Sequence, residues 1–239
     1  MTSSGFLIGV DRMAIGTLNE KPLHAALKEW YARPDDRFEV AVDGYVIDIV
    51  RGDLLIEIQT RGLVALKRKL ARLVEGHVVH LIYPVAAEKW IVRVDEDGAF
   101  LGRRKSPLRG SAMQVARELV SFPRLLADPH FSLEVVLIRE EEVRRHDTTR
   151  ARNWRRKGWM TVERRLLEVI DSCIFRSPTD LAALLPAELP EPFTARELAA
   201  ATGQPLWLTQ KLAFCLRETG VLVEAGKRGR SRLLARPVS

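Results

Sequence analysis

The 239-residue sequence has little cysteine, few aromatic residues and no long apolar run. Its two cysteines, Cys173 and Cys215, form no CxxC pair and stand among apolar residues. That context favours buried free thiols over a disulfide or a metal site. No run approaches the ~18 apolar residues of a membrane span, so we expect no membrane partner. The first 13 residues lack a basic segment followed by a long apolar core, which predicts no export signal and a cytoplasmic location.

The motifs of several enzyme classes are also lacking, since no P-loop, Rossmann fingerprint, zinc spacing or nucleophile triad is evident. What the chain has is positive charge, with a formal net charge of +7. Such a balance suits a polyanionic partner. At 46% hydrophobic and 29% charged residues, the composition is that of a soluble globular protein with one large or two ordinary domains.

Residues 38–60, FEVAVDGYVIDIVRGDLLIEIQT, predict three consecutive strands joined by two tight turns. Asp43-Gly44 and Gly52-Asp53 separate runs rich in β-branched residues, and both dipeptides are strong hairpin signals. A two-residue loop at Gly52-Asp53 pairs residues whose numbers sum to 105. Asp48 then faces Glu57 directly, on one side of the sheet, and Gln59 shares the face of Glu57.

Two carboxylates placed opposite each other in a sheet repel, and partial burial increases the cost. A divalent cation removes that penalty, because hard oxygen ligands suit Mg²⁺. The alternative is an exposed hairpin with both charges in solvent. Val46, Val50 and Leu55 share this face and argue against full exposure.

Helices are expected on both sides of these strands. Residues 16–32 have apolar residues at helical spacing, with Glu20 in the first turn, where it could also serve as a capping-box carboxylate. Residues 61–75 combine a leucine stripe with a basic face, and residues 77–85 read as a buried central strand. The order from residue 54 to residue 83 predicts a βαβ unit with parallel strands.

The remainder of a first domain, residues 1–143, is expected to add a hairpin at 88–94 and 99–104, a helix at 111–127 and a strand at 131–139. Residues 144–160, RRHDTTRARNWRRKGWM, carry many basic and almost no aliphatic residues, which predicts a basic linker. A second domain, residues 161–239, is expected to begin with a helix at 161–172.

The second domain continues with a short helix at 178–185 and a capping box, Thr194-Ala195-Arg196-Glu197, that opens the helix ending at Gly203. A further helix at 206–219 and a terminal hairpin, 221–224 with 231–235, follow. Leu208, Leu212 and Cys215 are expected to face inward. The order resembles winged helix-turn-helix domains. That resemblance implies a DNA-reading helix and wing, with candidate DNA contacts at Gln210, Lys211, Arg217, Lys227, Arg228 and Arg230. Winged helices also serve as protein-interaction modules.

The N-terminal arrangement resembles the PD-(D/E)XK nuclease superfamily, in particular its restriction-endonuclease-like and Holliday-junction-resolvase-like cores. The resemblance rests on Glu20 in a helix, Asp48 in a strand and Glu57-x-Gln59 in the next strand, and it covers residues 16–85. It implies an α/β fold with a mixed central sheet flanked by helices. It also implies Mg²⁺ or Mn²⁺ at Asp48, Glu57 and the Ile58 carbonyl, with Glu20 as a further acid.

Gln59 stands where the superfamily usually has a lysine, and it would position the attacking water without adding positive charge. Other members of the superfamily supply the lysine from the next helix, where Lys67 and Lys69 are the candidates. Arg61, Lys67 and Arg68 would contact backbone phosphates.

We therefore predict a DNA-binding, metal-dependent endonuclease for repair, recombination or defence. The alternatives are a non-catalytic DNA-binding or regulatory protein on a decayed nuclease scaffold and, third, a protein-assembly module with an acidic partner. A nuclease that cuts both strands often needs two sites, so a homodimer is a possible arrangement.

Overall fold

A mixed seven-stranded sheet organises the part of the chain that the computed structural model describes, residues 21–146 and 158–237. Six strands follow the order β1-β2-β3-β4-β6-β7, and β5 pairs with β4 outside this path. The strands are β1 (Arg37–Val42), β2 (Tyr45–Arg51), β3 (Leu54–Ile58), β4 (Val78–Val94), β5 (Phe100–Lys105), β6 (Phe131–His146) and β7 (Trp159–Phe175). The expected α/β fold with a mixed central sheet is confirmed.

The first three strands form the predicted antiparallel meander. Asp43 and Gly44 both have positive φ, 50° and 82°, as a two-residue hairpin turn requires. Between β2 and β3 the pairs run from Arg51↔Leu54 to Ile49↔Ile56, which confirms the register expected from a Gly52-Asp53 loop.

Two parallel pairs place β4 at the centre of the sheet, because β4 pairs in parallel with β3 on one side and with β6 on the other. The β3–β4 crossover holds η1 (Leu63–Leu66) and α2 (Lys67–Leu73), so the predicted βαβ unit is confirmed. Residues 77–94 were expected as two strands, but β4 is continuous through a bulge at Ala86/Glu88.

The β4–β6 crossover holds β5 and three short helical pieces: η2 (Ala112–Val115), α3 (Ala116–Leu119) and η3 (Pro123–Ala127). The prediction of one helix over 111–127 is wrong. Pro123 has no N–H and its ring blocks the preceding turn. Ser121 and Phe122 instead donate to Glu118 and Leu119 in tight 3₁₀-type bonds.

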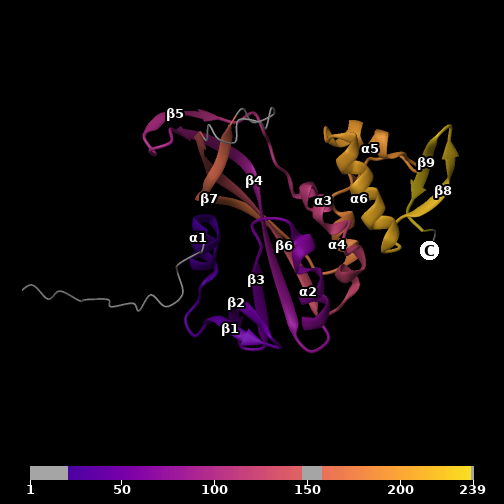
Figure 1. Ribbon diagram of the computed structural model, residues 1–239. Helices are drawn as coiled ribbons and strands as arrows, with labels where there is room; N and C mark the ends of the chain where they lie inside the picture. The colour runs from indigo at the N-terminus through magenta and orange to yellow at the C-terminus, as the bar shows by residue number, and fades with distance from the viewer. Residues whose placement is uncertain (1–20, 147–157, 238–239) are drawn as a thin grey trace, which may run out of the picture.

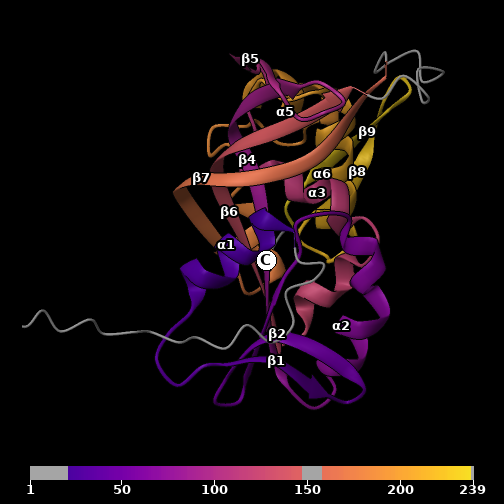
Figure 2. The ribbon, with the colours of Figure 1, turned by 60° about the vertical axis from the view of Figure 1, so that its left-hand side comes forward.

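Two apolar clusters cover the two faces of the sheet. On one face α1 (Pro22–Tyr31) buries Leu23 and Leu27 against Ile56, Ile58 and Val136. The larger cluster on the other face gathers α2, α3 and the C-terminal helices. Figure 1 shows α1 on one side of the long strands and α2 and α3 on the other. In Figure 2 the β1–β2 hairpin lies at one end of the long strands and β5 at the other.

The C-terminal elements are α4 (Pro178–Ala182), α5 (Ala195–Thr202), α6 (Leu206–Glu218), β8 (Val223–Arg228) and β9 (Ser231–Ala235). The predicted capping box is present, with Thr194 and Glu197 bonded reciprocally, and Gly203 ends α5 at a φ of 65°. Leu208, Leu212 and Cys215 are buried, as expected. They belong to the same apolar cluster as Leu119 of α3.

The helix predicted at 161–172 is wrong, because these residues lie in β7, which pairs antiparallel with β6 along its length. Val162, Leu166, Val169 and Ile170 fit a helical spacing, but the charged residues between them find their partners across the strands. Arg164 pairs with Glu140 and Arg165 with Glu141. Cross-strand pairing of this kind overrides a local helical pattern.

The expected basic linker, residues 144–160, follows a different course at both of its described ends. Residues 144–146 close β6 and residues 158–160 lead into β7, with His146 paired to Trp159. The segment therefore joins two neighbouring strands of one sheet, and its interior lies outside the described residues. None of the described helices is long and apolar enough to cross a membrane.

Candidate functional site

The site begins at a local break in the pairing of β2 at Asp48. Strands β1 and β2 pair on both sides of this residue but not at it, and Glu39 opposite has a φ of 53°. Positive φ is uncommon for a residue other than glycine. Ile47 and Ile49 belong to clusters on opposite faces, although regular alternation would place them on the same face. Asp48 is therefore not part of the β1–β2 pairing in which its two neighbours take part.

Glu57 lies in β3 on the face covered by α2, and its side chain is only 6% exposed. Lys69 reaches down from α2 and forms an ion pair with the Glu57 carboxylate. The same ammonium donates to the Val46 carbonyl at 2.6 Å. These contacts fix the Lys69 Nζ between β2 and β3.

Burial and the nearby Asp48 carboxylate raise the pKa of Glu57 to about 7, against the lowering effect of Lys69. The protein therefore tolerates two carboxylates and one ammonium in a largely dry place. Strong perturbation by burial and a specific charged partner is common at functional sites.

The Asp48 carboxylate is held by groups from two other elements. Its Oδ2 accepts from the Ile58 backbone N–H at 2.8 Å and lies 3.2 Å from His24 Nε2 of α1. Asp48 was expected directly opposite Glu57, but the two residues are not paired across β2 and β3. The pairing between β2 and β3 ends at Ile49, and the Asp48 side chain takes the next backbone donor instead.

Gln59 stabilises the turn after β3 through hydrogen bonds. Its backbone N–H donates to the Ile82 carbonyl at 2.9 Å, and its side-chain amide donates to the carbonyls of Arg61 and Gly62. The amide N–H groups are thus committed to the protein's own backbone, and the amide oxygen is left as the group that could orient a water molecule.

Three oxygen donors from neighbouring strands could hold a hard divalent cation: the carboxylates of Asp48 and Glu57 and the Ile58 carbonyl. In a strand the N–H and C=O of one residue point to the same side, so the Ile58 carbonyl points toward the side on which Asp48 accepts its N–H. Such oxygen sets suit Mg²⁺. Within residues 21–146 and 158–237, no group of three or more His, Cys, Asp or Glu side chains could hold a metal. Glu20 lies outside the described residues.

The predicted phosphate contacts separate in space. Arg61 lines a cleft beyond the end of β3. Lys67 borders a different cavity of about 540 Å³, beside Phe122 and Phe214. Arg68 is exposed on α2. Of the two lysines proposed to replace the missing one, the structure brings Lys69, and not Lys67, to Glu57.

Some of the basic residues predicted near the C-terminus line a common cleft. Gln210, Arg217 and Arg230 border about 300 Å³ between α5, α6 and β9, together with Arg196 and Arg232. Arg196 and Arg232 were missed, because neither stands on the predicted contact helix or the wing tip.

The remaining predicted contacts lie around this cleft. Lys227 is exposed in β8, and Lys211 is half-buried in α6. Arg228 forms an ion pair with Glu197 at 2.6 Å, so the capping box of α5 also holds the end of β8.

Sequence reasoning missed a polar network formed by Lys89, Glu140 and Arg164, which come from β4, β6 and β7. No spacing marks these residues, since 75 positions separate the first from the last and Arg164 was expected in a helix. His24 was missed as well, because a histidine on an amphipathic helix carries no signal of its partner.

Comparisons with known proteins extend over most of the chain. The model of a family described as "Domain of unknown function (DUF8091)" matches residues 21–176, the span from the start of α1 to the end of β7. An "Uncharacterized protein" of Treponema pallidum (strain Nichols) is 38% identical over 222 residues, 92% of this chain and 87% of that protein. No solved structure matches.

Proposed function

The chain belongs to the family described as "Domain of unknown function (DUF8091)", and we propose that it hydrolyses phosphodiester bonds of DNA with a divalent metal ion. The observation that carries the proposal is the cluster of Asp48, Glu57 and Lys69 at the point where β2 and β3 separate. The element order α1-β1-β2-β3-α2-β4 around it supports the resemblance to PD-(D/E)XK nucleases.

Asp48, Glu57 and the Ile58 carbonyl are the groups that would hold Mg²⁺ or Mn²⁺. The ion would lower the pKa of a bound water and neutralise charge on the scissile phosphate. It would also offset the two effects that raise the pKa of Glu57, the desolvation of its carboxylate and the repulsion from Asp48. These residues thus fit the ion in both ligand type and charge.

Lys69 takes the role of the lysine that is absent at Gln59. Its ammonium lies beside Glu57 and is fixed by the Val46 carbonyl, so it can donate to a phosphate oxygen or to the attacking water. Gln59 keeps the turn after β3 in place, and its amide oxygen can accept from that water. The water oxygen would attack phosphorus, one P–O ester bond would break, and a proton of the water would pass to the departing oxygen, which leaves as an alcohol.

The C-terminal elements supply a second DNA contact in this proposal. Helix α5, helix α6 and the β8–β9 hairpin follow the order of a winged helix-turn-helix domain. The cleft lined by Gln210, Arg217 and Arg230 is rich in donors for phosphates and base edges. A homodimer would provide the two sites that cutting both strands requires.

One observation favours the alternative of a non-catalytic DNA-binding protein on a decayed nuclease scaffold. Gln59 carries no charge, and its amide N–H groups are spent on the carbonyls of Arg61 and Gly62. In that case Lys69 would serve only as the counter-ion of Glu57.

A cleavage assay separates the two. Purified wild type, Glu57→Ala and the matched variant Glu75→Ala, which removes an exposed carboxylate after α2, are incubated with plasmid, branched and single-stranded DNA and Mg²⁺ or Mn²⁺. We expect Glu57→Ala to cut at least about 100-fold more slowly than the wild type, and Glu75→Ala to match the wild type. If the wild type cuts none of the substrates faster than Glu57→Ala, the nuclease proposal is wrong.

A further inference from the structure

A second cleft lies along β4, in the gap between two of its partners. Strand β3 pairs with Val78–Ile82 of β4, and β5 pairs with Trp90–Val94 on the same edge. Between them the chain after β5 approaches, where Gly110 and Ser106 donate to the Ala86 and Lys89 carbonyls. A cleft of about 240 Å³ remains here, directly beyond Gln59, and Thr60, Arg61 and Gly62 form one wall.

The side chains that line this cleft carry an excess of positive charge. Four cationic residues, Arg61, Lys89, Arg117 and Arg164, line the cleft with one carboxylate, Glu140. Two carboxylates outside the lining, Glu142 and Glu118, pair with Lys89 and Arg117. Arg61 has no ion pair within the part of the chain that the structure describes, and Arg117 is 53% exposed beside Glu118. A ligand that satisfies this lining is an anion.

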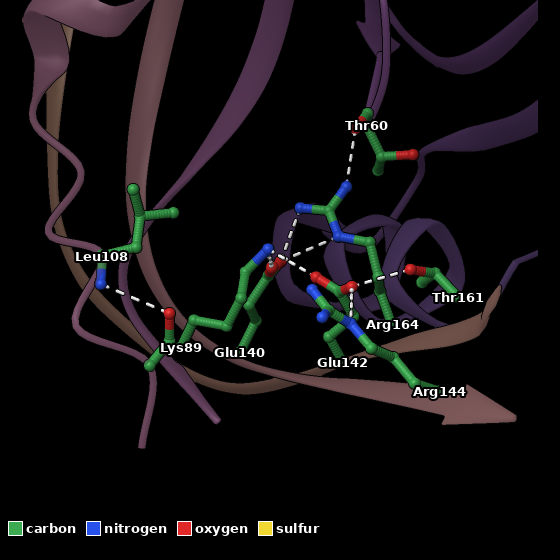
Figure 3. A network of polar contacts seen from close by, with 9 residues as sticks. Thr60, Lys89, Leu108, Glu140, Glu142, Arg144, Thr161 and Arg164 are labelled. Carbon is green, nitrogen blue, oxygen red and sulfur yellow. Dashed lines mark hydrogen bonds and ion pairs between the residues drawn. The ribbon is translucent and has the colours of Figure 1, made fainter. Parts of the chain in front are cut away.

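Two of the cations are held rigidly by a buried network, which Figure 3 shows. Glu140 is fully buried; its Oε2 accepts from Arg164 Nε at 2.9 Å, and Lys89 Nζ lies 2.8 Å from its Oε1. That Oε1 has no hydrogen-bond partner of acceptable geometry in the described structure. The carboxylate therefore positions both cations.

A second carboxylate completes the support. Glu142 accepts from Lys89 at 2.7 Å, from Arg144 at 2.8 Å and from Thr161 at 2.7 Å. Burial opposes ionisation, but these hydrogen bonds prevail and lower the pKa of Glu142 to about 2. Lys89 is thus held by two carboxylates, which limits the entropy it loses when it binds a ligand.

Arg164 connects the cleft to the candidate active site. Its Nη1 donates to the Thr60 carbonyl at 2.8 Å, one residue beyond Gln59 (Figure 3). Arg117, which also lines the cleft, donates to the Tyr83 hydroxyl at 3.2 Å. These bonds set the orientation of both guanidinium groups at one small volume, and the N–H groups that they leave unused can donate to phosphate oxygens.

We propose that this cleft binds a phosphate group of a nucleic-acid strand and so fixes the strand next to the Asp48–Glu57–Lys69 cluster. The choice of phosphate over another anion rests on the proposed function. The volume is below that of ordinary ligand pockets, which fits a phosphate group better than a whole cofactor. The phosphate is either an internal phosphodiester or the monoester at a strand end.

Binding measured without cleavage tests the proposal. Full-length protein in EDTA is titrated into fluorescent single-stranded oligonucleotides with a 5′-phosphate, a 3′-phosphate or hydroxyl groups at both ends. Arg61→Ala and Arg117→Ala remove exposed cleft residues, and Arg37→Ala removes an exposed arginine of β1 as the matched control. Each cleft variant is expected to bind about 5- to 10-fold more weakly than the wild type, and Arg37→Ala within about 2-fold.

The three oligonucleotides also show whether the cleft binds a terminal phosphate or an internal phosphodiester. If the cleft binds a strand end, the loss is confined to the oligonucleotide with that terminal phosphate. If it binds an internal phosphodiester, all three oligonucleotides lose affinity alike. Equal affinities of Arg61→Ala, Arg117→Ala and Arg37→Ala for every oligonucleotide would overturn the proposal. The binding assay does not depend on cleavage. If the wild type cuts no DNA but the cleft variants bind oligonucleotides more weakly, the nuclease proposal is wrong and the phosphate-cleft proposal is supported.

Discussion

Glu57 is nearly dry, stands beside a second carboxylate and depends on one lysine for compensation. Ionising it in the folded protein therefore costs free energy that the unfolded chain does not pay. The proposed chemistry and the instability of the site would then rest on the same atoms, a common property of active sites.

The pH dependence of stability should reveal this cost. The folded pKa of Glu57, about 7, exceeds its ordinary value of 4.5. The penalty is therefore absent below pH 4.5 and grows as the pH rises to 7, to about 3 kcal/mol at 1.36 kcal/mol per pKa unit. The stability advantage of Glu57→Gln over the wild type should therefore increase by this amount between pH 4.5 and pH 7. Urea unfolding at several pH values measures it.

The matched control is Glu75→Gln, which removes a carboxylate that is exposed on the turn after α2. Its stability difference from the wild type should stay small. A constant difference between wild type and Glu57→Gln from pH 4.5 to pH 7 would contradict the description of this site.

At the residue scale, the sequence predicted what depends on local order. The turn dipeptides fixed the register that brings Asp48 near Glu57, and Lys69 was one of two candidates for the displaced lysine. Choosing between Lys67 and Lys69 required the angle at which α2 crosses β3, which no spacing encodes. The network of Lys89, Glu140 and Arg164 required the pairing of three distant strands.

At the scale of elements, the chain after β5 is fixed by a close approach at Gly110. An added Cβ there would lie 2.3 Å from the Ala86 carbonyl oxygen and 2.8 Å from a Val85 methyl. Glycine is needed at this position because no side chain fits, and the cleft wall depends on it.

Gly110→Ala should therefore lower the free energy of unfolding by about 1–3 kcal/mol, because the backbone must move away from β4. Gly76→Ala is the control, since an added Cβ meets nothing within 4 Å there. Urea denaturation of both variants measures the difference. Equal stability of the two would show that the segment shifts without cost.

Elements with strong local signals were predicted well, including the β1–β2–β3 meander, the Thr194 capping box and the end of α5 at Gly203. The error at β7 has a physical cause. Its apolar spacing fits a helix, and only the pairing of its charged residues with β6 decides for a strand. Pro123 was the overlooked signal that divides the predicted helix at 111–127.

At the scale of the whole molecule, the C-terminal helices and the sheet share one apolar cluster. Leu81 of β4 and Val135 of β6 belong to the same cluster as Leu198, Leu208 and Leu212. The expectation of two parts joined by a basic linker gave no reason for such sharing, because contacts between distant segments leave no mark on composition.

A shared cluster predicts cooperative unfolding. The full chain should unfold in a single calorimetric transition, and a chain ending at Arg176 should expose apolar surface and bind a hydrophobic dye. Two separate transitions for the full chain, or a well-packed truncated chain without dye binding, would contradict the shared core.

The claim that Asp48, Glu57 and Lys69 form a hydrolytic site is tested most directly by two neighbouring lysines. Lys69 contacts Glu57, whereas Lys67 lies two residues earlier on the same helix and borders a different cavity. We compare single-turnover DNA cleavage with Mg²⁺ by wild type, Lys69→Met and Lys67→Met. The account predicts a loss of about 100-fold or more for Lys69→Met and less than about 3-fold for Lys67→Met. Equal rates for the two variants, or no cleavage by the wild type, would contradict it.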